Sequence, residues 1–223
     1  MQSILLSTAY FPPISWMAAA LQSESTVIEI HETYPKQTFR NRCNIATSSG
    51  ILSLTVPVKR VNGNHTKTCD IQIDNSGNWQ LLHWRSIITA YNKSPYFLYY
   101  RDLFEPVFFK KHERLIDLNM EIFEKLLKAM QINTLKISYS TNYEITPATC
   151  DLWNSFHPKT NRQPGIAIEF QRYMQAFEEN TGFISDLSIL DLIFNLGPAA
   201  YHYLANLKLS FEMQINATKD IQS

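Results

Sequence analysis

The fold is decided by residues 3–30, whose sequence is SILLSTAYFPPISWMAAALQSESTVIEI. The apolar run at residues 3–9 predicts a buried strand, and Val27–Ile30 predicts a second, β-branched strand. Between them, Pro12-Pro13 imposes an extended or turning path before a short helix over Ile14–Leu21. This order predicts a right-handed βαβ unit. Functional groups are then expected in the loops that follow the carboxyl ends of the strands.

Further strand and helix patterns follow along the chain. Apolar residues at helical spacing predict helices over Trp79–Tyr91 and Glu113–Met130. Segments 51–58 and 68–73 are separated by a turn at residues 62–64, and this arrangement is typical of a β-hairpin beside the sheet. Thr134–Ser140 is predicted to return to a strand.

The last third of the chain carries boundary signals. Residues 141–165 contain several prolines and predict a long irregular connection, followed by an edge strand over Ile166–Phe170. Ser185 or Asp186 is expected to cap a helix over Leu187–Leu196, which Gly197 and Pro198 end, before a last helix over residues 199–209. The predicted fold class is therefore α/β, with a mixed, mostly parallel sheet, packed helices and a β-hairpin insertion, in a single domain over residues 1–223.

Composition excludes several classes of protein. The 223 residues are 45% hydrophobic and 13% aromatic, which indicates an ordered globular chain. The formal net charge is zero, so binding of nucleic acid is not expected. The three cysteines are far apart and no metal-ligand spacing is present, so we expect no disulfide framework and no metal site. The chain lacks a signal-peptide pattern and any run of roughly 20 apolar residues, which favours a cytoplasmic protein without membrane insertion.

Residues 34–45, YPKQTFRNRCNI, have the composition of an anion-binding loop. Lys36, Arg40 and Arg42 supply three cations around the amide of Asn41. Arginine binds phosphate or carboxylate with two parallel hydrogen bonds, so this loop is suited to a nucleotide or sugar phosphate. The alternative is that these cations are solvated surface charges.

Two residues after the predicted strands are candidates for proton transfer. Tyr10 is a residue type found equally in a core or in a site, and its position after the first strand favours a pocket. His31 follows the second strand and precedes Glu32, so the two could exchange protons. Adjacent strand residues point to opposite faces, however, which argues against a shared task. We take Tyr10 and His31 as the catalytic candidates.

Five blocks recur together in a known family. They are Thr8–Pro13 (TAYFPP), the Arg40-Asn41-Arg42 loop, Thr55–Val58 (TVPV), His83–Phe97 (HWRSIITAYNKSPYF) and Leu187–Asn195 (LSILDLIFN) with the following Gly197. These blocks resemble the WbqC-like proteins, a family found among bacterial surface-polysaccharide genes, in a shorter, Bacteroides-type variant. The resemblance implies the pathway and adds Arg85 as a substrate-binding candidate. It also favours ligand binding by the basic loop over the surface-charge alternative.

The irregular connection and the predicted helix over Leu187–Leu196 add three further candidates. His157 and Lys159 flank Pro158 and are predicted to bind substrate; alternatively, Pro158 fixes a turn and Lys159 is solvated. Asp191 lies among apolar residues and, if buried, is expected to pair with an arginine of the basic loop.

Two functions remain open from the sequence. The first is a cytoplasmic transferase-type enzyme of O-antigen or capsule biosynthesis, with a nucleotide-activated sugar or related anionic precursor as its small-molecule partner. The alternative is a noncatalytic binding or scaffold protein of the same pathway. No GxGxxG or Walker A motif is present, so no dinucleotide or other cofactor is predicted. The oligomeric state is left open.

Overall fold

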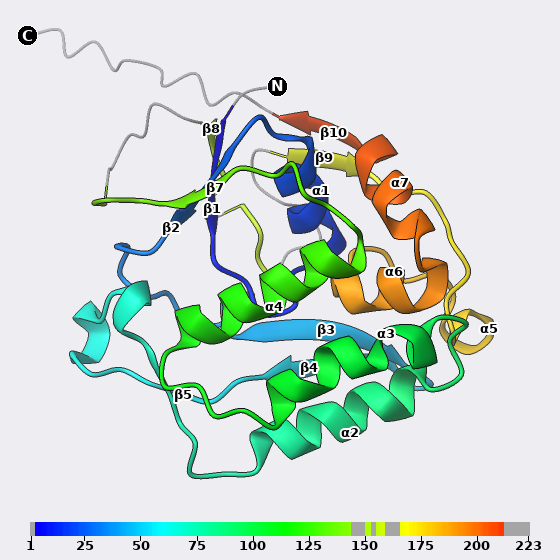
Figure 1. The fold of residues 1–223 in the computed structure, drawn as a ribbon, viewed down its shortest axis with the longest axis horizontal. Coiled ribbons are helices and arrows are strands. Elements are labelled where there is room, and N and C mark those ends of the chain that lie inside the picture. Colours follow the sequence, from blue (N-terminus) through cyan, green and yellow to red (C-terminus); the bar gives the residue numbers. More distant parts are fainter. Residues whose placement is uncertain (1–2, 144–149, 153–154, 159–165, 212–223) are drawn as a thin grey trace, which may run out of the picture.

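The computed structural model describes residues 3–143, 150–152, 155–158 and 166–211, and its centre is a four-stranded parallel sheet (Figure 1). The strand order is β7 (Ile137–Tyr139), β2 (Thr26–Glu29), β1 (Ile4–Ser7) and β8 (Cys150–Asp151). Strand β1 lies inside the sheet, with Leu5 opposite Val27 of the parallel β2. This confirms the predicted pairing and the α/β fold class.

Two helices cover one face of this sheet. Helix α1 (Ile14–Gln22) begins directly after Pro13, whose fixed φ of −65° suits the entry to a helix. Helix α4 (Leu115–Ala129) leads into β7 and buries a stripe that includes Leu118, Ile122 and Leu126. The Trp16 and Phe123 rings of the two helices meet edge to face with their centroids 5.5 Å apart. Both helices match the prediction to within a few residues.

The antiparallel hairpin is built differently from the prediction. Strand β3 (Arg42–Thr47) pairs with β4 (Gly50–Thr55), and a two-residue ladder joins β5 (Val58–Lys59) to β6 (Gln72–Ile73). The expected pairing of 51–58 with 68–73 is therefore wrong for its main part. The end of the basic loop is a strand because Cys43 and Ile45 are buried while Arg42 and Asn44 are half-buried on the other face.

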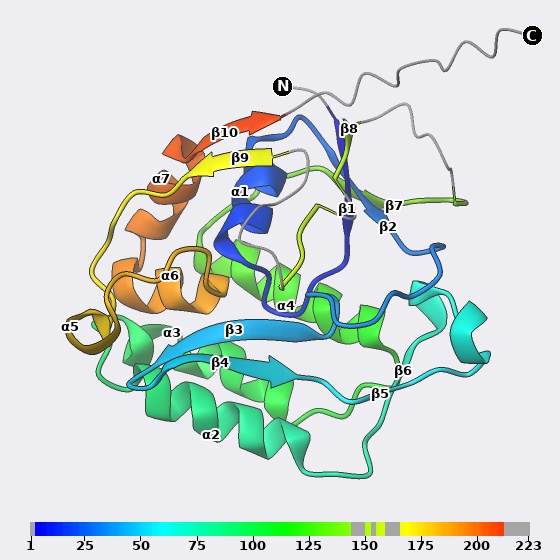
Figure 2. The ribbon, with the colours of Figure 1, turned by 180° about the vertical axis from the view of Figure 1, so that it is seen from behind.

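Helices lie beside the β3–β4 hairpin (Figure 2), and they carry many of the buried aromatic residues. Helix α2 (Trp79–Tyr91) has the predicted bounds, whereas α3 (Phe97–Phe104) and the 3₁₀ turn η3 (Glu105–Phe108) were not predicted. The Trp84 and Phe108 rings stack with centroids 5.1 Å apart. Two more 3₁₀ turns, η1 (Gly63–His65) and η2 (Thr68–Asp70), lie between β5 and β6.

The C-terminal part contains β9 (Ile166–Glu169), α5 (Glu178–Thr181), α6 (Ile189–Leu196), α7 (Ala199–Asn206) and β10 (Lys208–Phe211). Ser188 caps α6, since its Oγ accepts from the Leu190 N–H. The predicted caps were wrong, because the Asp186 carboxylate instead accepts from the backbone N–H and the hydroxyl of Ser15. The last helix is shorter than predicted, and the chain continues into β10, which pairs antiparallel with β9. Gly197 ends α6 as predicted.

The buried hydrophobic side chains of these elements form one cluster, to which both the parallel sheet and the hairpin contribute. The single-domain assignment stays a prediction. Within the described ranges, no helix is both long and apolar enough to cross a membrane.

Candidate functional site

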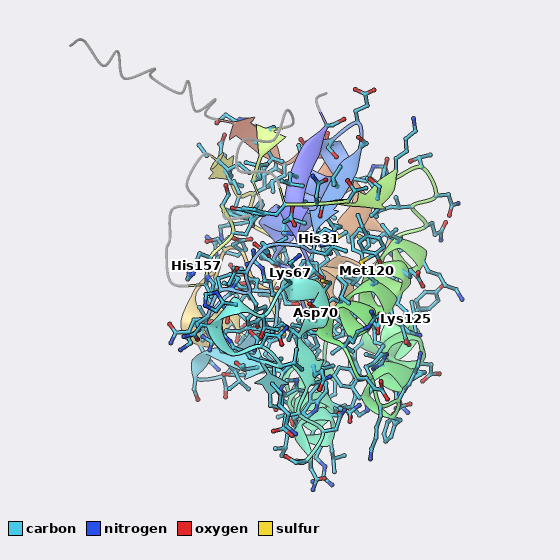
Figure 3. All side chains as sticks on the ribbon, turned by 90° about the vertical axis from the view of Figure 1, so that its left-hand side faces the viewer. His31, Lys67, Asp70, Met120, Lys125 and His157 are labelled. Carbon is cyan, nitrogen blue, oxygen red and sulfur yellow. The ribbon has the colours of Figure 1, made fainter. Side chains whose placement is uncertain are left out.

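The carboxyl ends of the parallel strands present polar groups at one edge of the sheet. His31 and Glu32 follow β2, and Ser140 follows β7. Thr8 follows β1 in the same way. Figure 3 looks at this side of the molecule and shows His31 below the two blue strands, with Lys67 beside it in projection. This is the edge at which ligands of open α/β sheets bind.

Glu29, the last residue of β2, holds this edge together. Its buried carboxylate Oε1 accepts from the His31 N–H at 2.6 Å, the Glu32 N–H at 3.0 Å and the Ser140 hydroxyl at 3.1 Å. The carboxylate therefore fixes the turn after β2 and ties it to the end of β7. Glu29 was not predicted from the sequence, although a carboxylate at the end of a β-branched run was the available signal.

The side chain of Arg40 is buried beneath the basic loop, so the alternative of a solvated surface charge is wrong for this residue. Its Nε donates to Glu32 Oε1 at 2.6 Å and its Nη2 to Oε2 at 2.9 Å, and both side chains are 1% exposed. The Thr68 hydroxyl donates to the same Oε1 at 3.1 Å. Burial raises the pKa of the Glu32 carboxyl, and Arg40 opposes this. The pair supports the loop from inside, so direct binding of substrate by Arg40 stays a prediction.

Tyr10 is fully buried and hydrogen-bonded to His83, with 2.9 Å between its hydroxyl oxygen and Nδ1. Burial lowers the pKa of His83 to about 4, although a hydrogen bond with the Thr55 backbone opposes the shift. A neutral ring that donates to a carbonyl accepts at its other nitrogen, so the Tyr10 hydroxyl donates to Nδ1. Burial also raises the pKa of Tyr10 well above its usual range. A catalytic role of Tyr10 requires that a ligand reach this enclosed pair.

Arg42, Arg60 and Tyr34 form the outer part of the basic loop region, which we call the arginine cluster. The Arg60 guanidinium lies over the Tyr34 ring at 5.4 Å and donates to the Tyr34 carbonyl at 3.1 Å. Arg42 donates through Nε to the Thr55 hydroxyl at 3.1 Å. Burial dominates the pKa of Tyr34 and raises it to about 12, although Arg40, Arg60 and Arg42 all act to lower it. Arg60 was not among the binding residues predicted from the sequence, because it follows β5 and lies outside residues 34–45.

Charge in the arginine cluster is not compensated. In the described part of the chain, neither Arg42 nor Arg60 has a carboxylate partner. The buried Tyr34 hydroxyl also lacks a hydrogen-bond partner there. An arginine fork without a carboxylate is suited to an oxyanion from a ligand.

The remaining predicted residues lie at different places. Lys36 is exposed in the basic loop, and Asn41 is buried, where its amide donates to the Val56 carbonyl at 2.8 Å. Arg85 is exposed on α2, two residues from His83, and therefore points about 200° away from the Tyr10 contact. His157 is half-buried in the segment after β8, whereas Lys159 lies outside the described residues. The structure thus does not bring Arg85 together with Tyr10, and its binding role stays a prediction.

Asp191 has neutral partners instead of the predicted arginine. The Tyr173 hydroxyl donates to its Oδ2 at 2.6 Å, and the Gln175 amide donates to the same oxygen at 3.1 Å. The arginine pairing is wrong because Arg40 is held by Glu32. Elsewhere in the described ranges, no group of three or more His, Cys, Asp or Glu side chains could hold a metal ion.

Comparison with known proteins identifies the family of this chain. The family model described as "WbqC-like protein family" matches residues 8–154. The chain belongs to the WbqC-like protein family. A relative from Mycobacterium tuberculosis, the uncharacterized protein Rv1507c, is 28% identical over 204 residues, covering 77% of this chain and 83% of that protein. No solved structure matches the chain significantly.

The polar groups described at the carboxyl ends of the parallel strands, together with the arginine cluster, form what we call the strand-end region. All of this region lies within the residues matched by the WbqC-like model. The turn held by Glu29, the Arg40–Glu32 pair and the arginine cluster all fall within residues 8–154. Asp191 and its partners Tyr173 and Gln175 fall outside the match.

Proposed function

We propose that this WbqC-like protein is a transferase-type enzyme of surface-polysaccharide biosynthesis that acts on a nucleotide-activated sugar or related anionic precursor. Arg42 and Arg60 bind the anionic group, and His31 handles a proton at the end of β2. The assignment to surface-polysaccharide biosynthesis is based on the family resemblance. The binding role of Arg42 and Arg60 is based on the geometry of the arginine cluster. Lys36, Arg85, His157 and Lys159 remain proposed contacts for other parts of the substrate.

The arginine cluster is the observation that carries this proposal. Of three neighbouring guanidinium groups in the described part of the chain, only Arg40 is neutralised, by Glu32. Arg42 and Arg60 have only neutral oxygen partners there, the Thr55 hydroxyl, the Asn64 amide and the Tyr34 carbonyl. Each charge-assisted bond to a ligand phosphate is worth about 1.5–3 kcal/mol.

His31 suits proton transfer by its position. Its backbone is fixed by Glu29, and its side chain is half-buried with no hydrogen-bond partner among the described residues. Histidine is the side chain that most often exchanges protons near neutral pH. In a transfer to a hydroxyl group, His31 accepts the acceptor's proton while the arginines stabilise the negative charge on the departing phosphate.

A noncatalytic binding protein of the same pathway is the second candidate. The burial of Tyr10 favours it, because one of the two predicted proton donors is enclosed and bound to His83. Such a protein uses the same arginine cluster to hold an anionic precursor without converting it.

Binding calorimetry with UDP-glucose, dTDP-glucose and GDP-mannose tests the shared binding step. We expect Arg42→Gln and Arg60→Gln to weaken the tightest of these complexes by about 1.5–3 kcal/mol for each lost bond. Lys128→Gln is the control, since Lys128 is exposed near the end of α4 that leads toward the amino end of β7. Equal affinities for all four proteins would contradict an anion site at the arginine cluster.

Turnover separates the two candidates. Nucleotide release is followed by mass spectrometry with each donor and a panel of sugar acceptors. The enzyme proposal expects release that His31→Gln abolishes without weakening donor binding. Binding without release from any donor would favour the noncatalytic alternative.

A further inference from the structure

A second candidate site lies on the opposite side of the molecule, near α5 at the right of Figure 1. Three segments line a half-open pocket of about 680 Å³: residues 93–95 after α2, residues 172–179, and Asn195 of α6. A pocket of this volume accommodates a small organic ligand. None of the residues predicted from the sequence to bind substrate lines it.

The charges around this pocket are balanced. Arg172 and Glu178 form an ion pair with each other. Lys93 and Glu179 also line the pocket, and neither has an ion-pair partner among the residues that the structure describes. These two side chains offer the pocket a cation and an anion, which together suit a ligand that carries both charges.

Neutral hydrogen-bonding groups also line this pocket. Ser94 is 6% exposed, and its hydroxyl has no partner within the described ranges. Asn195 uses its amide nitrogen on the Asp191 carbonyl at 2.8 Å, which leaves its own carbonyl oxygen as an acceptor. A buried hydroxyl without a partner costs stability, so a ligand group that bonds to it gains affinity.

The wall of the pocket is held by Gln175. Its amide donates to the Ile184 carbonyl at 2.8 Å and accepts from the Ile184 N–H at 2.9 Å. Nearby, Met174 is 80% exposed at the rim and, with Pro95, offers apolar contact. The polar groups thus surround a preformed pocket with a partly apolar edge.

We propose that this pocket binds a small zwitterion of the size of a dipeptide or tripeptide. The ligand carboxylate pairs with Lys93 and its ammonium group with Glu179. A backbone amide of the ligand bonds to the Ser94 hydroxyl and the Asn195 carbonyl, and a ligand side chain contacts Met174. This site is independent of the arginine cluster and of the function proposed for it.

The dipeptide alanyl-leucine and two blocked forms test the assignment by calorimetry. Amidation of the carboxylate removes the partner of Lys93, and acetylation of the amine removes the partner of Glu179. We expect each block to weaken binding about tenfold to the natural protein. In the Lys93→Gln variant, amidation of the dipeptide carboxylate should not weaken binding further. In the Glu179→Gln variant, acetylation of the dipeptide amine should not weaken binding further. Lys128→Gln and Glu24→Gln serve as charge-matched controls, because neither residue lines the pocket.

Ser94→Ala distinguishes a ligand contact from a structural role. Because the hydroxyl has no partner in the described part of the protein, we expect a melting temperature that is unchanged or higher and about tenfold weaker dipeptide binding. The proposal is overturned if alanyl-leucine does not bind at millimolar concentration, or if blocked and free forms bind equally. It is also overturned if Ser94→Ala binds as well as the natural protein.

Discussion

Two buried carboxylates are stabilised in opposite ways in the two halves of the molecule. Glu32, at the strand ends, faces the guanidinium of Arg40 and the hydroxyl of Thr68. Asp191, in α6, receives hydrogen bonds from the neutral Tyr173 and Gln175. Burial raises the pKa of both carboxyls, and in each case the polar partners oppose the shift.

The difference shows what each region depends on. Removing one partner of a buried ion pair leaves an uncompensated charge, which costs more than removing one of several neutral donors. The strand-end region should therefore respond sharply to single substitutions but tolerate loss of the whole pair. Single substitutions around Asp191 should each lower the free energy of unfolding by a smaller amount.

The largest effect is expected at the ion pair. Arg40→Met and Glu32→Leu should each lower the free energy of unfolding by about 3–5 kcal/mol, because each leaves the other charge buried and unpaired. The double variant should lose far less than the sum. Chemical denaturation of all four proteins measures the coupling. Additive losses would show that the two side chains do not stabilise each other.

Loss of stability in mild acid should come next in size. The folded pKa of His83 is about 4, below its ordinary value of 6.5, so the unfolded chain takes up a proton first as the pH falls. The contribution of His83 is present above about pH 6.5 and is lost toward pH 4, on the order of 3 kcal/mol at about 1.4 kcal/mol per unit. The same titration on His83→Gln should lack this component. An unchanged slope would mean that His83 is not buried as a neutral ring.

Tyr173→Phe should remove the shortest hydrogen bond to Asp191. We expect a loss of about 1.5–3 kcal/mol near pH 8, where the carboxylate needs its donors most. Tyr203→Phe is the matched control, because its hydroxyl bonds to the Gln171 carbonyl and not to a carboxylate. Equal losses in the two variants would argue against a charged Asp191.

Asp191→Asn should remove the pH dependence that Asp191 contributes to stability, with a smaller effect. The folded pKa of Asp191 is raised, so its contribution to stability is present at low pH and is lost as the pH rises through that value. The variant should lie within about 1 kcal/mol of the natural protein and gain on it as the pH rises. Unfolding measured across a series of pH values checks the sign. A growing advantage of the natural protein with pH would refute it.

The smallest change in stability is expected in the arginine cluster. Arg42→Gln and Arg60→Gln should change the free energy of unfolding by about 0.5 kcal/mol or less, because neither arginine compensates a buried carboxylate. Melting curves recorded beside those of Arg40→Met separate ligand-facing from structural arginines. A loss as large as that of Arg40→Met would show that the outer arginines also hold the loop.

Local patterns predicted the elements in which short-range physics dominates. The βαβ unit, α2 and α4 follow from proline positions and from apolar spacing that matches one strand or helix face. The β3–β4 hairpin was missed because the cations of Arg40 and Arg42 obscured the alternation of Cys43 and Ile45. Helix α3 was missed since its aromatic residues carry no distinct boundary signal.

The sequence by itself determined the α/β class and the placement of polar groups after the strands, because both depend on periodicity and on turn residues. Only the tertiary structure decided which polar groups meet. Arg40 faces Glu32, eight residues away, and Tyr10 meets His83, 73 residues away. Such partners depend on how helices and strands pack together, and composition alone cannot distinguish an arginine that supports a loop from one that faces a ligand.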